Sequence, residues 1–87
     1  GTMTLNSGAK VARNTAGNNG GGIHNIWGSL NLNSGAGVTL NTASKNGGGI
    51  YNESPGKVTI NSGASVTQNT AGSAGGGEAQ QGCEGSI

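Results

Sequence analysis

The chain has 87 residues and a net charge of +1, and 49 of its residues are glycine or small polar residues: 20 Gly, 12 Asn, 9 Ser and 8 Thr. The chain has one Trp, one Tyr, no Phe and 30% apolar residues. This composition excludes a conventional core of large side chains. The four basic and three acidic residues form no charge runs, which argues against a charge-expanded disordered chain and against a nucleic-acid-binding surface.

Three motifs recur in the same order along the chain. N-S-G-A stands at 6–9, 33–36 and 61–64, N-T-A at 14–16, 41–43 and 69–71, and G-G-G at 20–22, 47–49 and 75–77. The spacing is 27 residues and then 28. Self-similarity of this length is typical of solenoids, in which each repeat packs only against its neighbours. We therefore expect a single domain with repeats at 1–27, 28–54 and 55–81 and an irregular end at 82–87.

Apolar and polar residues alternate with a period of two in each repeat. In chain order, the predicted strands lie at 3–5, 9–11, 23–25, 30–32, 36–38, 50–52, 58–60 and 64–66. Short alternating runs between Gly, Asn and Ser indicate strands and tight turns, and the glycine density argues against helix. The prediction is an all-β fold: a parallel β-helix of triangular cross-section, with three coils of about 27 residues and three short strands per coil.

Stacking of the repeats brings equivalent residues into columns. Asn14, Asn41 and Asn69 predict a side-chain amide ladder at a corner. Asn25 and Asn52, with Gln80 below them, predict a second ladder. Glycines are expected to supply positive φ at the corners. The expected inward columns are Val11/Val38/Val66, Met3/Leu30/Val58, Leu5/Leu32/Ile60, Ala9/Ala36/Ala64, Ala16/Ala43/Ala71 and Ile23/Ile50.

The pairing of V-x-x-N with G-G-G-I, at 11–14 with 20–23 and at 38–41 with 47–50, resembles a known repeat. It is similar to the F-x-x-N and G-G-A-I repeats of chlamydial polymorphic outer-membrane proteins, and to other surface proteins with pectin-lyase-like right-handed β-helices. The chain has Val for Phe and Gly for Ala, and the third repeat reads G-G-G-E. The resemblance covers residues 1–77 and implies a right-handed solenoid, in a family that includes adhesins, passengers, fibres and lyases.

Acidic and metal-ligating residues are scarce. The chain has no Asp, and Glu53, Glu78 and Glu84 each stand in a different place, whereas Ca²⁺ sites need several clustered carboxylates. The single His24 and single Cys83 leave no zinc quartet. We expect no catalytic residue, no metal site and no cofactor, and hence a protein that is not an enzyme. No apolar run is long enough to span a membrane.

Threonines form a repeated outward pattern at Thr15, Thr42 and Thr70. The simplest interpretation is that Thr suits exposed strand positions. The alternative is a flat Thr array that orders water, as in ice-binding solenoids of this general shape. The side chains of Arg13, Leu40 and Gln68, which lie near that array, are expected to make it uneven.

Three ring-bearing residues are candidates for surface contact. Tyr51 and Trp27 are expected to be exposed, and His24 is expected to face solvent in the column of Tyr51. Exposed rings stack on sugar faces, so a glycan ligand is one candidate partner, although Trp27 could equally cover a corner between coils. Cys83, the lone thiol, is a candidate cross-link between chains in an oxidising medium, or an inert residue.

The predicted solenoid is wider than tall, because three coils about 4.8 Å apart make a slab roughly 14 Å high. Its ends expose unpaired strand edges and show no polar or helical cap. We expect a homo-oligomer that stacks head to tail into an extracellular fibre or surface layer. The alternative is an excised segment of a longer cell-surface adhesin or autotransporter-like passenger that binds glycans or host surfaces. Either interpretation places the protein outside the cell or at its surface.

Overall fold

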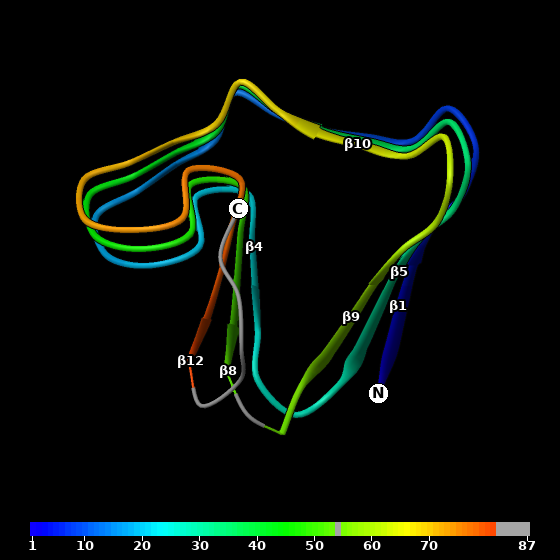
Figure 1. The fold of residues 1–87 in the computed structure, drawn as a ribbon, viewed down its shortest axis with the longest axis horizontal. Coiled ribbons are helices and arrows are strands. Elements are labelled where there is room, and N and C mark those ends of the chain that lie inside the picture. The colour runs from blue at the N-terminus through cyan, green and yellow to red at the C-terminus, as the bar shows by residue number, and fades with distance from the viewer. Residues whose placement is uncertain (54, 82–87) are drawn as a thin grey trace.

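A computed structural model describes residues 1–53 and 55–81. In these residues the secondary structure consists of twelve strands. They contain no helix, as the sequence predicts. Figure 1 looks down the shortest axis of the molecule, and the strands of the three repeats overlap in this view. The principal extents are 29 × 26 × 19 Å, so the stack is wider than tall.

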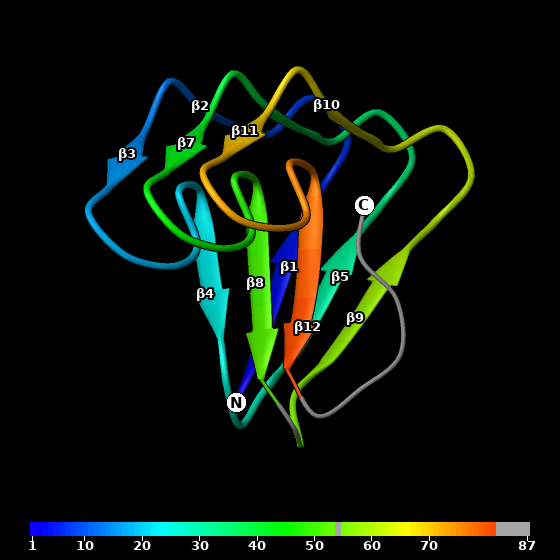
Figure 2. The ribbon, with the colours of Figure 1, turned by 60° about the vertical axis from the view of Figure 1, so that its left-hand side comes forward.

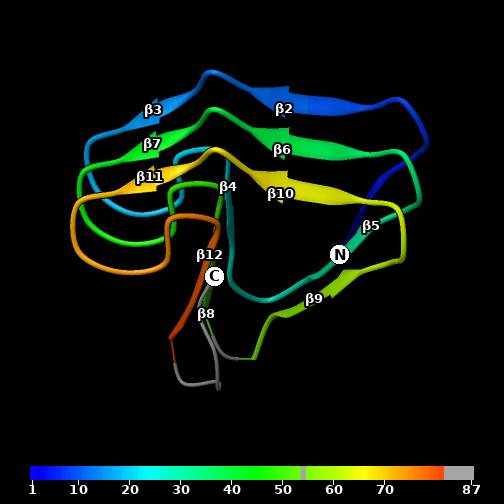
Figure 3. The same cartoon turned by 45° about the horizontal axis from the view of Figure 1, so that its top comes forward.

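The strands form four three-stranded parallel sheets, each with one strand from every repeat. The first sheet contains β1 (Thr2–Leu5), β5 (Ser29–Leu32) and β9 (Lys57–Ile60). The second contains β2 (Lys10–Ala12), β6 (Gly37–Thr39) and β10 (Ser65–Thr67). The third contains β3 (Thr15–Ala16), β7 (Thr42–Ala43) and β11 (Thr70–Ala71), and the fourth contains β4 (Ile23–Asn25), β8 (Ile50–Glu53) and β12 (Glu78–Gln81). Figures 2 and 3 show the strands of each sheet side by side.

Strand pairing follows the register predicted from the motifs. Leu5 pairs with Leu32, and Leu32 pairs with Ile60. The β2, β6 and β10 strands align Val11, Val38 and Val66 in the same way. The repeat spacing of the sequence is therefore the pairing register of the sheets.

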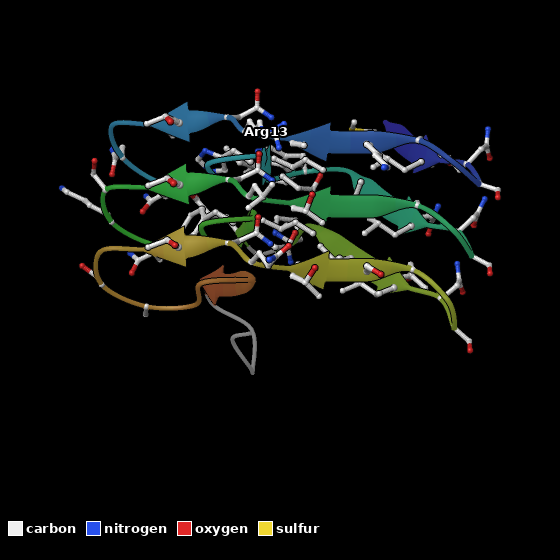
Figure 4. The ribbon with its side chains drawn as sticks, turned by 90° about the horizontal axis from the view of Figure 1, so that it is seen from above. Arg13 is labelled. Atoms are coloured by element: carbon white, nitrogen blue, oxygen red, sulfur yellow. The ribbon has the colours of Figure 1, made fainter. Side chains whose placement is uncertain are left out.

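The prediction of three strands per repeat is wrong: each repeat has four. The additional strands are the two-residue strands β3, β7 and β11, on the N-T-A motif. A left-handed residue separates each of them from the preceding strand, at Arg13 (φ 59°), Leu40 (φ 57°) and Gln68 (φ 56°). A positive φ turns the chain sharply, so one sheet ends and the next begins. Figure 4 labels Arg13 at this corner, between β2 and β3.

The core lies between the sheets and is best sealed in the second repeat. Leu32, Val38 and Ile50 are fully buried there. Val11 and Val66, the register partners of Val38 in the outer repeats, are only half-buried. Each of them has a neighbouring repeat on one side only.

Candidate functional site

The two ends of the stack expose the edges of the sheets. We call the outer edges of β1, β2, β3 and β4 the N-terminal end face, and those of β9, β10, β11 and β12 the C-terminal end face. Each edge strand pairs with one neighbour in the described chain, so part of its N–H and C=O groups has no strand beside it. Such edges pair readily with a further strand.

The end faces also open the apolar core. Met3 is 47% exposed, although its register partner Leu30 is 1% exposed. At the other end Ile60 is 37% exposed, although its partner Leu32 is fully buried. A column position that is core in the second repeat can therefore be surface in an outer repeat, although Leu5, the first-repeat partner of Leu32, is only 4% exposed.

The asparagines of the N-T-A motif form a ladder that runs along the stack. The Asn41 Oδ1 accepts hydrogen bonds from both the backbone N and the Nδ2 of Asn14, each at 3.0 Å. The Asn41 Nδ2 donates to Val11 O and to Asn69 Oδ1, each at 3.0 Å. Asn41 is fully buried, and these four bonds use both lone pairs and both amide hydrogens of its side chain.

Two further asparagine ladders are present. Asn25 Nδ2 donates to Asn52 Oδ1 at 2.7 Å, within the column predicted from the sequence. Asn33 Nδ2 donates to Asn6 Oδ1, and Asn61 Nδ2 donates to Asn33 Oδ1, both at 3.2 Å. The sequence analysis missed this last ladder, although its signal was available in the Asn that opens each N-S-G-A motif.

The threonine column lies on the third sheet. Thr15, Thr42 and Thr70 are register partners and all are exposed. Thr39 and Thr67 are register partners on the neighbouring second sheet, and the left-handed Leu40 lies between Thr39 and Thr42.

His24, Tyr51 and Glu53 meet on the fourth sheet. The Nε2 of His24 lies 3.1 Å from Oε1 of Glu53, and the His24 ring meets the Tyr51 ring edge-on with centroids 5.0 Å apart. The expectation that Tyr51 is exposed is wrong, because it is 5% exposed. The contacts of His24 with Tyr51 and Glu53 join the first repeat to the second. Burial, and secondly the Glu53 carboxylate, raise the pKa of Tyr51 above its usual value.

Trp27 lies in the turn after β4 and is 80% exposed. It is the most exposed of the large apolar residues, and Ile26 beside it is 38% exposed. Of the three rings, those of His24 and Tyr51 are in contact. The three surface-contact candidates therefore do not form one aromatic platform: Tyr51 is core, His24 is partly exposed, and Trp27 stands in solvent.

The remaining expectations concern metals, cofactors and membranes. Among the described residues no group of three His, Cys, Asp or Glu side chains could hold a metal ion. In the same residues no helix could cross a membrane. Cys83, Glu84 and the predicted irregular end lie outside the described residues.

A comparison with protein-family models, with curated proteins and with solved structures finds no match. The all-strand architecture, with parallel three-stranded sheets, is consistent with a β-solenoid.

Proposed function

We propose that this chain is a structural subunit of an extracellular fibre or surface layer, built by head-to-tail stacking of right-handed β-solenoid coils. The observation that carries the proposal is the pair of open end faces. They combine sheet edges with exposed core residues, Met3 at one end and Ile60 at the other. The handedness and the location outside the cell come from the resemblance of the repeats to bacterial surface proteins.

The two end faces are complementary in register. A second copy placed against the C-terminal end face would set its Met3 beside Val58 and its Leu5 beside Ile60, which continues the columns that Leu30 and Leu32 occupy inside the chain. Each added copy would again present an open C-terminal end face. Because this contact uses two different surfaces and does not close, it produces a filament.

The ionic groups are also distributed unevenly along the stack. The first repeat contains Lys10 and Arg13 and no acid, and the second contains Lys45 and Glu53. The third contains Lys57 and Glu78. Head-to-tail stacking therefore places the basic first repeat against a third repeat with one cation and one acid, whereas head-to-head stacking places two basic repeats together.

A second candidate function rests on Trp27. An indole that is 80% exposed fits contact with the face of a sugar, as expected of a segment from a cell-surface adhesin or passenger. In that case further repeats of the same longer chain would cover the end faces. Titration of Trp27 fluorescence with soluble glycans would reveal such binding, and a flat titration would argue against it.

Assembly is tested by sedimentation and negative-stain microscopy of the purified chain. We expect filaments about as wide as the 29 × 26 Å face of the stack. The variant Ile60→Lys puts a charge into the open core column and should keep the chain dispersed, whereas Thr59→Lys, at the exposed neighbour in β9, should still assemble. Dispersed single copies of the unmodified chain at all concentrations would contradict the proposal.

A further inference from the structure

The triple glycines pair between repeats in an unusual way. The N–H groups of Gly20, Gly21 and Gly22 and of Ile23 all donate to carbonyls of the second repeat, at 2.9–3.2 Å. The N–H groups at 47–50 donate in the same way to the carbonyls at 74–77 of the third repeat, at 2.8–3.0 Å. In an ordinary parallel strand, consecutive N–H groups point alternately to the two sides. Here four consecutive N–H groups point the same way, toward the C-terminal end face.

The direction of the outermost groups follows from peptide geometry. In a trans peptide the C=O of one residue and the N–H of the next point in opposite directions. The carbonyls at 74–77 accept bonds from the second repeat, so the N–H groups at 75–78 point away from it, out of the C-terminal end face. By the same argument, the carbonyls at 19–22 point out of the N-terminal end face.

Only glycine is compatible with this arrangement. Gly20, Gly47 and Gly75 have φ of 65–70°, which disfavours any residue with a side chain. At the next position, a Cβ on Gly48 would collide with the carbonyl oxygens of Thr70 and Gly76. The glycine row therefore packs directly against the backbone of the third sheet.

We infer that the triple-glycine rows set the direction in which two copies of this chain stack. This inference rests on the proposed function. One end face presents a row of N–H donors and the other a row of C=O acceptors, so a head-to-tail contact pairs donors with acceptors. A head-to-head contact would set carbonyl against carbonyl. The rows are aligned along the stack, so their peptide dipoles add and favour the same direction.

Disulfide trapping tests the direction without disturbing the fold. Ser7 and Ser62 occupy the same exposed turn in the first and third repeats, before Gly8 and Gly63. In head-to-tail stacking, Ser62 of one copy lies one strand spacing, about 4.8 Å, from Ser7 of the next, within disulfide reach. Two copies of Ser7 then lie about 14 Å apart, beyond that reach. The variants Ser7→Cys and Ser62→Cys, each combined with Cys83→Ser, are mixed under mild oxidation.

The expected result is a mixed Ser7→Cys/Ser62→Cys dimer in at least tenfold excess over either homodimer. Homodimers in equal or greater amount, in a sample that sediments as filaments, would overturn the stacking direction while leaving assembly intact. Filaments without any cross-link would overturn it as well. A sample that stays dispersed and unlinked would overturn both this inference and the proposed function.

Chemical synthesis of the chain tests the glycine row itself. Replacing the amide N–H of Gly76 by an ester oxygen removes one outward donor, and the same change at Gly48 removes a donor that already bonds to Gly75 O within the chain. Loss of one hydrogen bond should weaken assembly of the Gly76 ester about fivefold. Its melting temperature in dispersed form should fall only slightly, because the ester carbonyl of Gly75 still accepts a hydrogen bond from Gly48 N, although a weaker one. The Gly48 ester should show the lower melting temperature. Unchanged assembly of the Gly76 ester would overturn the role of the row.

Discussion

The second repeat and the two outer repeats contain the same motifs, yet the chain buries them very differently. Leu30, Leu32 and Val38 are at most 1% exposed in the second repeat. Their register partners Met3 and Ile60 are 47% and 37% exposed. The difference does not lie in the residue types, since all are apolar. A repeat on both sides therefore buries these positions almost completely, whereas an outer repeat leaves some of them, but not Leu5, open to solvent.

The asparagine ladder gives the largest expected contrast between the second and outer repeats. In the non-assembling Ile60→Lys background, Asn41→Ala should lower the free energy of unfolding by about 3 kcal/mol, because buried partners such as Val11 O lose their hydrogen bonds. Asn14→Ala, at an exposed end of the ladder, should cost about 1 kcal/mol. Urea unfolding monitored by circular dichroism gives both values. Equal losses would contradict the dependence of burial on stacking position.

A second prediction concerns strain that should not depend on position in the stack. Leu40 and Gln68 both adopt the left-handed conformation, at φ 57° and 56°. Leu40→Gly and Gln68→Gly should each raise the free energy of unfolding by about 1 kcal/mol, because glycine relieves the clash of Cβ with the backbone. The matched control Thr59→Gly, in the exposed strand β9, should lower it by about 0.5 kcal/mol. A gain at Leu40 without a gain at Gln68 would show that stacking, rather than local geometry, sets the strain.

The left-handed residues mark a feature of the fold that the sequence did not predict. Motif spacing predicted the register of every sheet, because a parallel stack aligns residues at the repeat distance. It could not predict the corner at Arg13, Leu40 and Gln68, since a basic, an apolar and an amide residue share no turn signature. Two-residue strands such as β3 are too short for alternation to be recognised.

The candidate site was predictable to a different degree. The repeat spacing predicted that His24 and Tyr51 occupy the same column, and their rings are in contact. Spacing did not indicate that Tyr51 would be buried, because alternation placed it on the outer side of its strand. The direction of the glycine amides was equally inaccessible, since it depends on backbone dihedral angles that glycine leaves open.

The smallest expected effect is a shift in the pKa of Tyr51, which contacts His24 across the boundary between the first and second repeats. Burial, and then the Glu53 carboxylate, raise the pKa of Tyr51 above its unfolded value of 10.0, so the folded chain holds the phenolic proton more tightly than the unfolded chain does. Stability from this group is fully present below about pH 10 and is lost as pH rises through the folded pKa. Glu53→Gln removes the weaker cause and should move the Tyr51 pKa part of the way back toward its usual value. Because the chain has a single Tyr, the ultraviolet absorbance of tyrosinate reports this titration directly. A Tyr51 titration that Glu53→Gln leaves unmoved would show that burial between repeats alone raises this pKa.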